Sequence, residues 1–443
     1  MNYTQTLEFL YAAMPSFQRQ GAQAYKPGIE RITEFCRVMG NPQRNYFVIH
    51  VAGTDGKGSV SSMLAAVLQS AGYRTGLFTS PHLLDFRERI RVDGEIISKQ
   101  KVVNFVDKYR EAMIGCGLSF FEMTAAMAFD YFSQSDVEVA VVETGLGGRL
   151  DATNIVTPVV SVITNVGLEH TDLLGGTLPA IAAEKAGIIK KSIPVVIGER
   201  NDAIDAVFER RAAELKSKVV YAEEAFLLRG YTPRPEGNRF RVERVRDGYI
   251  YDISVDISGE CQRRNIVTAC AVADFLHEET PLTISRRALL DGMRHAAADT
   301  GLCGRWQKIA EAPLTVCDTG HTPYAFRYIA RQVGDMQCGG RKVAVLGFSN
   351  DKKIDEIFCE LSAAEGLHDV ILTHADAARA ASTGMLREIA EKYGFDCTCT
   401  DSVAEAVALA REKAGDEGFV FLGGSNYLVA DYLSLAASSE NAV

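Results

Sequence analysis

A glycine-rich stretch near the N-terminus combines the residue types that phosphate binding needs. It reads Gly53-Thr54-Asp55-Gly56-Lys57-Gly58-Ser59, and it lies between the apolar run Tyr46–Val51 and apolar residues at helical spacing from Val60. In a strand, loop and helix of this kind, glycines let backbone N–H groups approach a phosphate, and Lys57 neutralises the terminal phosphates. Ser59 is then placed to bind Mg²⁺. The spacing differs from the standard Walker A pattern, so a tight strand-to-helix turn with an exposed lysine is the alternative.

Side chains that bind metals follow two further apolar runs. Glu143 comes directly after Val137–Val142, and His170 lies a short way after Pro158–Ile163. Because ligands bind at the carboxyl ends of strands in an open α/β sheet, both side chains are candidates to hold a metal ion. Taken singly, such a Glu is more often a solvated strand end and such a His a hydrogen-bonded loop residue. Lys185 lies near the end of a helical stretch, where its ordinary role is to favour the helix dipole.

Two more strand ends in the C-terminal part of the chain carry polar residues. Asp318 and His321 follow the run Leu314–Cys317, and Lys342–Leu346 leads into the polar segment 347–353. Each of these two segments is alternatively interpreted as a plain turn between a strand and a helix. Together, carboxylates, a histidine and basic residues at strand carboxyl ends indicate two half-sites, one in each half of the chain.

The elements that must position these residues alternate between strand and helix. Short β-branched runs are separated by helical stretches such as Val60–Gln69, which implies parallel sheets with helices on both faces. The predicted strands of the first series are Tyr46–Val51, Thr75–Phe78, Val137–Val142, Pro158–Ile163 and Pro194–Ile197. Those of the second series are Leu314–Cys317, Lys342–Leu346, Val370–Thr373 and Phe419–Leu422. The fold class is therefore α/β, with two domains.

A change of pattern marks the domain boundaries. From about residue 219 to residue 257, polar and apolar residues alternate around turns at Pro235–Asn238 and Arg246–Gly248, which predicts a small antiparallel β appendage. The segment Ala298–Gly304 is rich in small residues and is the predicted linker. The first domain is thus expected to span residues 1–297 and the second residues 305–443.

Composition and charge exclude several classes of partner. The 443-residue chain has a formal net charge of -10, so no large positive field exists to attract nucleic acid or an anionic membrane. No apolar segment reaches the roughly eighteen residues of a membrane span, and the N-terminus lacks a signal-peptide pattern, so a cytoplasmic protein is expected. Ten cysteines are too few for a disulfide framework, and the pair Cys397 and Cys399 lacks further ligands nearby for a zinc site.

The order and wording of these motifs resemble one family along nearly the whole chain, the folylpolyglutamate and dihydrofolate synthases of the Mur ligase superfamily. The motifs that carry the resemblance are Pro27-Gly28-Ile29-Glu30-Arg31-Ile32, His50-Val51-Ala52 with the loop 53–59, Thr79-Ser80-Pro81-His82-Leu83, Phe121-Glu122-Met123-Thr124, Glu143–Asn154, His170-Thr171-Asp172, Glu184-Lys185-Ala186-Gly187, Gly304-Arg305-Trp306-Gln307 and Gly424-Ser425-Asn426-Tyr427-Leu428. The resemblance implies a Mur-ligase-like fold, with an N-terminal P-loop ATPase domain and a C-terminal Rossmann-like α/β domain.

The resemblance also implies roles for individual residues. The implied ATP-binding residues are Thr54, Asp55, Gly56, Lys57, Gly58, Ser59, Asn265, Arg305 and Asp318. The implied ligands of two Mg²⁺ ions are Ser80, Glu143, His170 and, if it is carbamylated, Lys185. The implied catalytic residues are Lys57, Lys185 and His321. The positions near the pterin-containing substrate are Phe121, Glu122, Leu150, Asp151 and Ala152. Carbamylation makes physical sense, because CO₂ turns a lysine cation into a carboxylate that can bind a metal ion.

The reaction that the resemblance implies joins two small molecules at the expense of ATP. The carboxylate of dihydropteroate or a folate attacks the γ-phosphate to give an acyl phosphate, and the amine of L-glutamate then displaces the phosphate. A monomer is expected. The sequence leaves open whether the enzyme adds the first glutamate, extends a polyglutamate tail, or does both.

Two departures from the family pattern motivate alternatives. The family usually has Asn at the position of Asp55, and an Asp-Gly-Ala-His-Asn-Pro-like run where this chain has Asp318–Pro323. A carboxylate beside a triphosphate is repulsive unless a metal ion or Lys57 compensates. One alternative is therefore a catalytically silent nucleotide- or folate-binding protein, which retention of Lys57, Glu143 and Lys185 disfavours. The other is a ligase of cell-wall nucleotide precursors, which the absence of a separate N-terminal UDP-binding segment before the loop disfavours.

Overall fold

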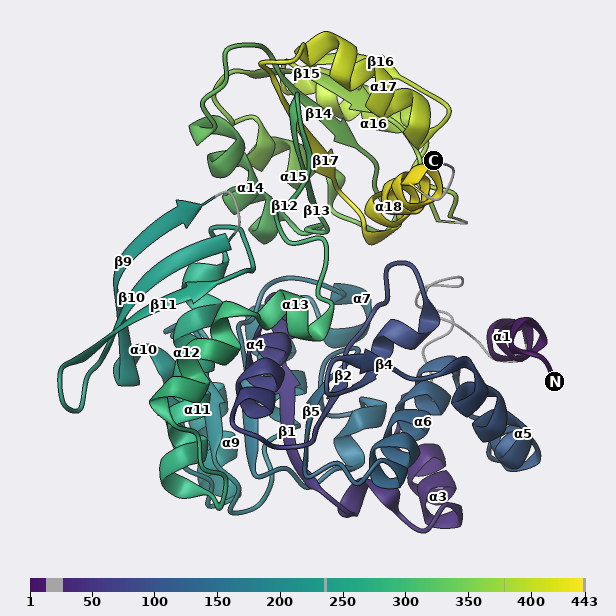
Figure 1. The fold of residues 1–443 in the computed structure, drawn as a ribbon, viewed down its shortest axis with the longest axis vertical. Coiled ribbons are helices and arrows are strands. Elements are labelled where there is room, and N and C mark those ends of the chain that lie inside the picture. The colour runs from purple at the N-terminus through teal and green to yellow at the C-terminus, as the bar shows by residue number, and fades with distance from the viewer. Residues whose placement is uncertain (13–26, 235–236, 378, 441–443) are drawn as a thin grey trace. The chain divides into compact units, whose positions relative to one another are not determined.

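The chain folds into two compact units. The structure, a computed structural model, describes residues 1–12, 27–234, 237–377 and 379–440 (Figure 1). The first unit comprises Met1–Thr232, Arg239–Asp256 and Gln262–Leu302. The second unit comprises Pro233–Asn238, Ile257–Cys261 and Cys303–Val443. Each unit contains a mostly parallel sheet between helices, so the predicted α/β class is confirmed.

An eight-stranded sheet forms the centre of the first unit, in the order β4-β3-β2-β5-β1-β6-β7-β8. Its strands are β1 (Phe47–Ala52), β2 (Thr75–Phe78), β3 (Ile90–Val92), β4 (Glu95–Ile96), β5 (Val139–Glu143), β6 (Val160–Ile163), β7 (Val195–Ile197) and β8 (Val219–Tyr221). The strands β2, β5, β1, β6, β7 and β8 all run parallel to one another, whereas β3 pairs antiparallel with both β2 and β4. The five predicted strands all form. Because β5, β1 and β6 are neighbours, their carboxyl ends lie side by side.

Helices cover both faces of this sheet. On one face, α4 packs against β1, β2 and β5 and against three helices from the end of the unit. These four helices are α4 (Lys57–Ser70), α11 (Gln262–Glu279), α12 (Arg286–Arg294) and α13 (Ala296–Thr300). The unit also contains the helices α1 (Tyr3–Ala12), α7 (Thr171–Leu174), α8 (Leu178–Ala186), α9 (Asp205–Glu214) and α10 (Ala222–Ala225).

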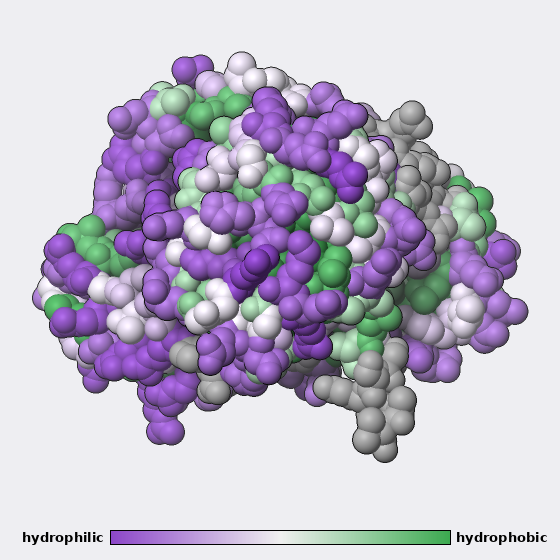
Figure 2. Space-filling model, turned by 90° about the horizontal axis from the view of Figure 1, so that it is seen from above, coloured by the Kyte–Doolittle hydropathy of each residue, from purple (hydrophilic) through white to green (hydrophobic). Residues whose placement is uncertain are grey.

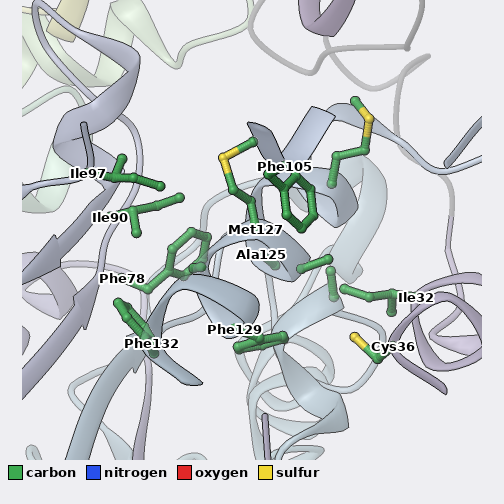
Figure 3. Packing of buried hydrophobic residues seen from close by; sticks show 14 of the residues in the cluster. Ile32, Cys36, Phe78, Ile90, Ile97, Phe105, Ala125, Met127, Phe129 and Phe132 are labelled. Atoms are coloured by element: carbon green, nitrogen blue, oxygen red, sulfur yellow. The ribbon is translucent and has the colours of Figure 1, made fainter. Parts of the chain in front are cut away.

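An aromatic-rich core fills the other face of the sheet. It packs α3 (Glu30–Val38), α5 (Lys99–Cys116) and α6 (Phe120–Gln134) against the central strands. Figure 3 shows Phe78 of β2 with Phe129 and Phe132 of α6, all fully buried. Since each buried aromatic side chain contributes about 1.5–3 kcal/mol by leaving water, this face holds the sheet in a fixed shape.

A three-stranded sheet forms the predicted appendage, but it is smaller than expected. Its strands are β9 (Phe226–Arg234), β10 (Gly237–Arg244) and β11 (Tyr249–Val255). The expected appendage began at about residue 219, whereas Val219–Tyr221 forms β8 and pairs in parallel with β7. Its β-branched residues suit a buried sheet as well as a hairpin, so pattern alone did not distinguish them. Pro235 and Glu236 of the predicted turn lie outside the described residues.

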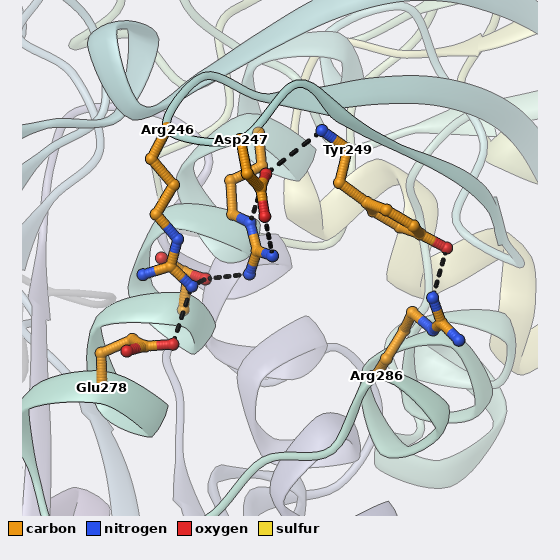
Figure 4. A network of polar contacts seen from close by, with 7 residues as sticks. Arg246, Asp247, Tyr249, Glu278 and Arg286 are labelled. Atoms are coloured by element: carbon orange, nitrogen blue, oxygen red, sulfur yellow. Dashed lines mark hydrogen bonds and ion pairs between the residues drawn. The ribbon is translucent and has the colours of Figure 1, made fainter.

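Ion pairs fix the turn between β10 and β11 to the helices of the first unit (Figure 4). The guanidinium of Arg246 donates to Glu278 at 2.7 Å and to Asp274 at 3.1 Å, both on α11. Arg286 of α12 donates to the hydroxyl of Tyr249 at 2.6 Å. The appendage therefore belongs with α11, the helix that also approaches the glycine-rich loop.

The second unit is a six-stranded sheet in the order β12-β13-β17-β14-β15-β16. Its strands are β12 (Gln307–Glu311), β13 (Leu314–Asp318), β14 (Lys342–Leu346), β15 (Leu367–Leu372), β16 (Asp396–Cys399) and β17 (Phe419–Gly423). Only β12 is antiparallel. The helices are α14 (Pro323–Asp335), α15 (Ile354–Leu361), α16 (Thr383–Lys392), α17 (Val403–Ala414) and α18 (Asn426–Glu440). Separate apolar clusters on the two faces of the sheet confirm a doubly wound arrangement.

Part of the predicted linker is helical. Residues 298–300 lie in α13, which ends before Gly301 in the left-handed conformation, and the two units divide between Leu302 and Cys303. Its small residues predicted a linker, but α13 begins with three alanines, and Ala has the highest helix propensity. Ala296 and Thr300 of this helix are buried.

The face of the molecule drawn in Figure 2 is mostly hydrophilic, and its apolar areas are interrupted by hydrophilic residues. Among the helices of the described ranges, none has both the length and the apolar character needed to cross a membrane.

Candidate active site

The glycine-rich loop connects β1 to α4 at the carboxyl edge of the first sheet. Gly56 is the N-cap of α4 with φ +80°, and the helix begins at Lys57 rather than at the predicted Val60. A side chain at Gly56 would be strained by this backbone and would place a Cβ 2.3 Å from the Asn265 amide oxygen. The first helical amides, from Lys57 to Ser59, therefore point out of the N-terminus without intrahelical partners, as phosphate binding requires.

Lys57 folds back over its own loop. Its ammonium donates to the carbonyl of Gly53 at 3.1 Å and to that of Thr54 at 2.9 Å. The side chain is half-buried. It is therefore held at the mouth of the loop, within reach of an anion at the helix N-terminus.

The segment after β6 holds the first half of the loop. The side-chain oxygen of Asn165 accepts from the amides of Thr54 at 3.2 Å and Asp55 at 2.8 Å. The hydroxyl of Thr164 donates to the carbonyl of Asp55 at 2.6 Å, and the amide of Gly167 donates to the Thr54 hydroxyl at 2.9 Å. Nothing in the sequence marks these residues as functional, because polar residues after a strand are common in loops.

The start of α11 reaches the second half of the loop. The side chain of Gln262 donates to the Ser59 hydroxyl at 3.4 Å and accepts from the Asn265 amide at 2.8 Å. All three side chains are buried. The structure thus brings Asn265, predicted from a distant part of the sequence, next to Gly56 and Ser59.

Glu143 and Ser80 meet beside the loop. Glu143 ends β5, is 3% exposed, and accepts from the Ser80 amide at 3.0 Å. β5 pairs with β1 in a register that sets Glu143 opposite Val51. The buried carboxylate therefore lies at the strand end next to the glycine-rich loop.

Lys185 is buried in α8 and is surrounded by charges. Burial, together with the positive charge of Lys57, lowers its pKa to about 7, and the carboxylates of Glu169 and Asp55 oppose this shift. A lysine that is partly neutral near pH 7 is one whose amine can react with CO₂. The carboxylate of Asp55 thus lies near enough to Lys185 to favour the charged form of that lysine.

His170 lies next to Glu169, after β6. It has φ +50°, precedes α7, and its Nε2 is 3.5 Å from the Glu169 carboxylate. Non-glycine residues rarely adopt this backbone, and such residues cluster at functional sites.

The donor set fits Mg²⁺ better than a metal bound by protein alone. Across the described residues, no three His, Cys, Asp or Glu side chains gather into a metal cluster. The predicted ligands Ser80 and Glu143 supply oxygen atoms and touch one another. Mg²⁺ prefers oxygen ligands and typically takes one or two carboxylates, so the buried Glu143 carboxylate suits it.

Among the predicted substrate-binding residues, Phe121 and Leu150 are half-buried, whereas Glu122, Asp151 and Ala152 are buried. The ring of half-buried Phe121 lies against Gly145, where an added Cβ would come within 2.5 Å of it. Buried Glu122 accepts from the Ser119 amide at 2.7 Å and pairs with Arg31 at 3.2 Å. Its carboxylate is thus engaged within the protein.

Asp151 is likewise engaged by its own loop. Its carboxylate accepts from the amides of Gly145, Leu146 and Thr153, each at 2.9 Å. Burial raises the pKa of Asp151, and these hydrogen bonds oppose the shift. Leu150 is half-buried and Ala152 is buried at the start of the short 3₁₀ helix Ala152–Ile155. These residues shape the loop after β5.

The second unit holds its predicted residues together at the end of β13. The carboxylate of Asp318 accepts from the amides of Trp306 at 2.8 Å and Gly320 at 2.7 Å, and burial raises its pKa against the charge of Arg305. Arg305 donates to the hydroxyl of Thr319, and His321 contacts the Thr319 carbonyl at 2.9 Å. The three predicted residues therefore form one polar group.

Thr322, one of the departures, has a clear local role. Its hydroxyl accepts from the Ala325 amide at 3.0 Å and caps α14. Asn and Thr both cap helices well, so the replacement keeps the start of α14 intact.

Comparison with known proteins identifies the class. The family model described as "Mur ligase middle domain" matches residues 51–273, and the model described as "Mur ligase, glutamate ligase domain" matches residues 304–426. The chain belongs to the Mur ligase family. This agrees with the loop, the Glu143 strand end and the two α/β units described above.

Close relatives define the branch of that family. Folylpolyglutamate synthase of Lacticaseibacillus casei is 36% identical over 73% of this chain and 74% of that protein. Dihydrofolate synthase/folylpolyglutamate synthase of Bacillus subtilis is 32% identical over 92% of this chain and 94% of that protein. A solved structure of E. coli FolC in complex with DHPP and ADP has a TM-score of 0.85 at 28% identity, covering 99% of both chains. The chain is a ligase of the folylpolyglutamate/dihydrofolate synthase group, and the cell-wall alternative is not favoured.

Proposed function

We propose that the protein is an ATP-dependent ligase that joins the carboxylate of dihydropteroate, of a (poly)glutamyl folate, or of both to the amine of L-glutamate. The observation that carries this proposal is the convergence of three strand ends. The loop after β1, Glu143 at the end of β5 and the 164–170 segment after β6 belong to neighbouring parallel strands. They set a phosphate-binding helix N-terminus beside a buried carboxylate.

In this proposal, the residues 54–59 hold the phosphates of ATP. The amides at the start of α4 bind phosphate oxygens. The ammonium of Lys57 releases the loop carbonyls that it contacts and binds the terminal phosphates instead. Asn265, Arg305 and Asp318 are further proposed nucleotide-binding residues.

Two Mg²⁺ ions are proposed to accompany ATP, held by Ser80, Glu143, His170 and carbamylated Lys185. When bound, they would neutralise phosphate charge. Glu143 is suited to this role because its carboxylate is buried at a strand end, and Lys185 because its amine is partly neutral near pH 7.

The chemistry proceeds by two displacements. A carboxylate oxygen of the pterin-containing substrate attacks the γ-phosphorus, the bond to the ADP oxygen breaks, and an acyl phosphate forms. The neutral amine of glutamate then attacks the acyl carbon, phosphate leaves, and the amine gives up one proton as the amide forms. We propose that Phe121, Leu150 and Ala152 contact the pterin-containing substrate and that His321 assists the reaction from the second unit.

The test is ADP release by the purified protein with Mg²⁺ and ATP. We expect release that requires both L-glutamate and either dihydropteroate or tetrahydrofolate. The Lys57→Met variant should lose it, whereas Lys191→Met, which alters an exposed lysine of the same unit, should keep it. Absence of glutamate-dependent release with every folate offered would reject the proposal.

We propose that the protein acts as a monomer on small molecules, in the cytoplasm. Residues 1–297 would bind phosphate, and residues 305–443 would carry the second half-site. Sedimentation of the purified chain tests the monomer directly.

A further inference from the structure

The two halves of the phosphate-binding loop are held by different parts of the first unit. The side-chain oxygen of Asn165 accepts from the amides of Thr54 and Asp55, at 3.2 and 2.8 Å. The Thr54 amide also donates to the backbone carbonyl of Asn165 at 3.1 Å. The amides that follow Asp55 belong to the helix N-terminus, where no intrahelical acceptor exists. Asn165 therefore decides which amides face an incoming phosphate, because it turns the first two away and leaves those at the helix start.

The loop packs closely against the segment after β6, and this contact restricts the conformation of the loop. A Cβ on Gly53 would lie 1.8 Å from the Thr164 hydroxyl, and that hydroxyl donates to the carbonyl of Asp55. The contact fixes the carbonyl side of the loop while Asn165 fixes its amide side. A polar side chain that accepts two backbone amides holds a loop more tightly than either bond alone.

Asn165 is itself oriented by a charged pair. Its amide nitrogen donates to the Glu199 carboxylate at 3.5 Å, which sets the side-chain oxygen toward the loop. Glu199 in turn pairs with Arg264 of α11. Gly198 allows this approach, since a Cβ there would lie 2.4 Å from the Thr164 carbonyl.

The contacts from Asn165 through Glu199 to Arg264 connect the loop to α11 a second time. Arg264 neighbours Asn265, whose side chain already lies against Gly56 at the other end of the loop. α11 therefore touches the second half of the loop directly and the first half through Glu199 and Asn165.

We propose that Asn165 is a positioning residue for nucleotide, oriented by the Glu199–Arg264 pair, and that it sets the loop in its phosphate-binding shape before ATP arrives. The inference rests on the proposed use of ATP. It assigns Asn165 no contact with the reacting atoms, so its removal should weaken nucleotide binding and spare the binding of the other substrates.

The test compares ADP binding by calorimetry in the full-length protein and three variants. Asn165→Ala should weaken ADP binding about tenfold or more, since the Asp55 amide loses its acceptor and the Thr54 amide keeps only the backbone carbonyl of residue 165. Glu199→Ala should weaken it roughly threefold. The double variant should match Asn165→Ala, because Glu199 acts through Asn165 and the two effects then do not add. In steady-state assays, the KM for ATP should rise in Asn165→Ala while those for the folate and glutamate stay within about twofold.

Asn45→Ala is the matched control, because Asn45 is an exposed amide before β1, at the opposite edge of the same sheet. It should bind ADP like the wild type. Wild-type affinity in Asn165→Ala, or effects of the two single variants that multiply in the double variant, would overturn the proposal. If Asn165→Ala does not fold by circular dichroism, Glu199→Ala decides, and unchanged affinity in it is the overturning result. Failure of the wild type to bind ADP would instead reject the proposed function.

Discussion

The buried side chain of His50 should make the stability of the first unit depend on pH. It is the one polar side chain within β1, is fully buried, and its Nε2 is 2.8 Å from the Thr153 hydroxyl. Its Nδ1 has no hydrogen-bond partner among the described residues. Burial, together with the positive charge of Lys190, lowers the pKa of His50 from 6.5 to about 3. The ring must therefore stay neutral in the folded protein at ordinary pH.

The sign and size of the effect follow from this pKa. The unfolded chain binds the proton more readily, so stability is present above pH 6.5 and is lost as the pH falls toward the folded value of about 3. Each pH unit in this window costs about 1.36 kcal/mol. Between pH 8 and pH 5, His50 should therefore remove about 2 kcal/mol from the free energy of unfolding.

The assay is urea unfolding of the first unit at pH 8 and pH 5, followed by far-UV circular dichroism. His50→Leu removes the titrating ring, and the Thr153 hydroxyl keeps its bond to Asp151. This variant should lose about 2 kcal/mol less than the wild type between the two pH values. Replacement of exposed His295 by Leu should leave the loss of unfolding free energy between the two pH values as in the wild type. Fluorescence of the single tryptophan, Trp306, should show that unfolding of the second unit is the same in His50→Leu as in the wild type. Equal losses in His50→Leu and the wild type would refute a buried neutral histidine.

Three further outcomes follow from the site. Gly56→Ala should abolish nucleotide binding, since its Cβ would collide with Asn265, whereas Gly72→Ala has a similar backbone at φ +92° with nothing within 4 Å and should bind normally in the same calorimetric titration. Glu143→Gln should raise the Mg²⁺ concentration needed for half-maximal ADP release about tenfold or more; an unchanged Mg²⁺ titration would contradict its assignment as a ligand. Lys185→Met should lack the carbamate signal that ¹³C-bicarbonate gives in NMR spectra of the wild type; an identical signal in both would place the carbamate elsewhere.

The sequence predicts the central elements well because buried parallel strands are continuous apolar runs. β1 and β5 are buried along nearly their whole length, and both were expected within two residues of their observed ends. The edges were harder. β3 is short, contains Arg91 and lies next to the edge strand β4, and β12 is half-exposed at the edge of its sheet, so neither has the apolar pattern of a central strand.

The start of α4 shows why local pattern misplaces a boundary. The apolar periodicity begins at Val60, but the helix begins at Lys57, because Gly56 adopts the left-handed conformation that caps it. Helix periodicity reports the buried face, whereas the cap depends on backbone geometry that only the folded loop reveals.

The candidate site was partly predictable for a similar reason. Glu143 follows an apolar strand, and its position beside the loop follows from strand order alone. Asn165 could not be found this way, because its importance comes from two amides more than a hundred residues away in the sequence. The engagement of Asp151 by its own loop was equally invisible before the fold was known.

The most direct test of the proposed ligase activity is mass spectrometry of the products formed from ATP, Mg²⁺ and L-glutamate, with dihydropteroate and tetrahydrofolate offered in separate reactions. We expect a product heavier by one glutamyl residue from at least one of them, formed in step with ADP and absent in Lys57→Met. ADP release without any glutamylated pterin, or no release at all, would contradict it.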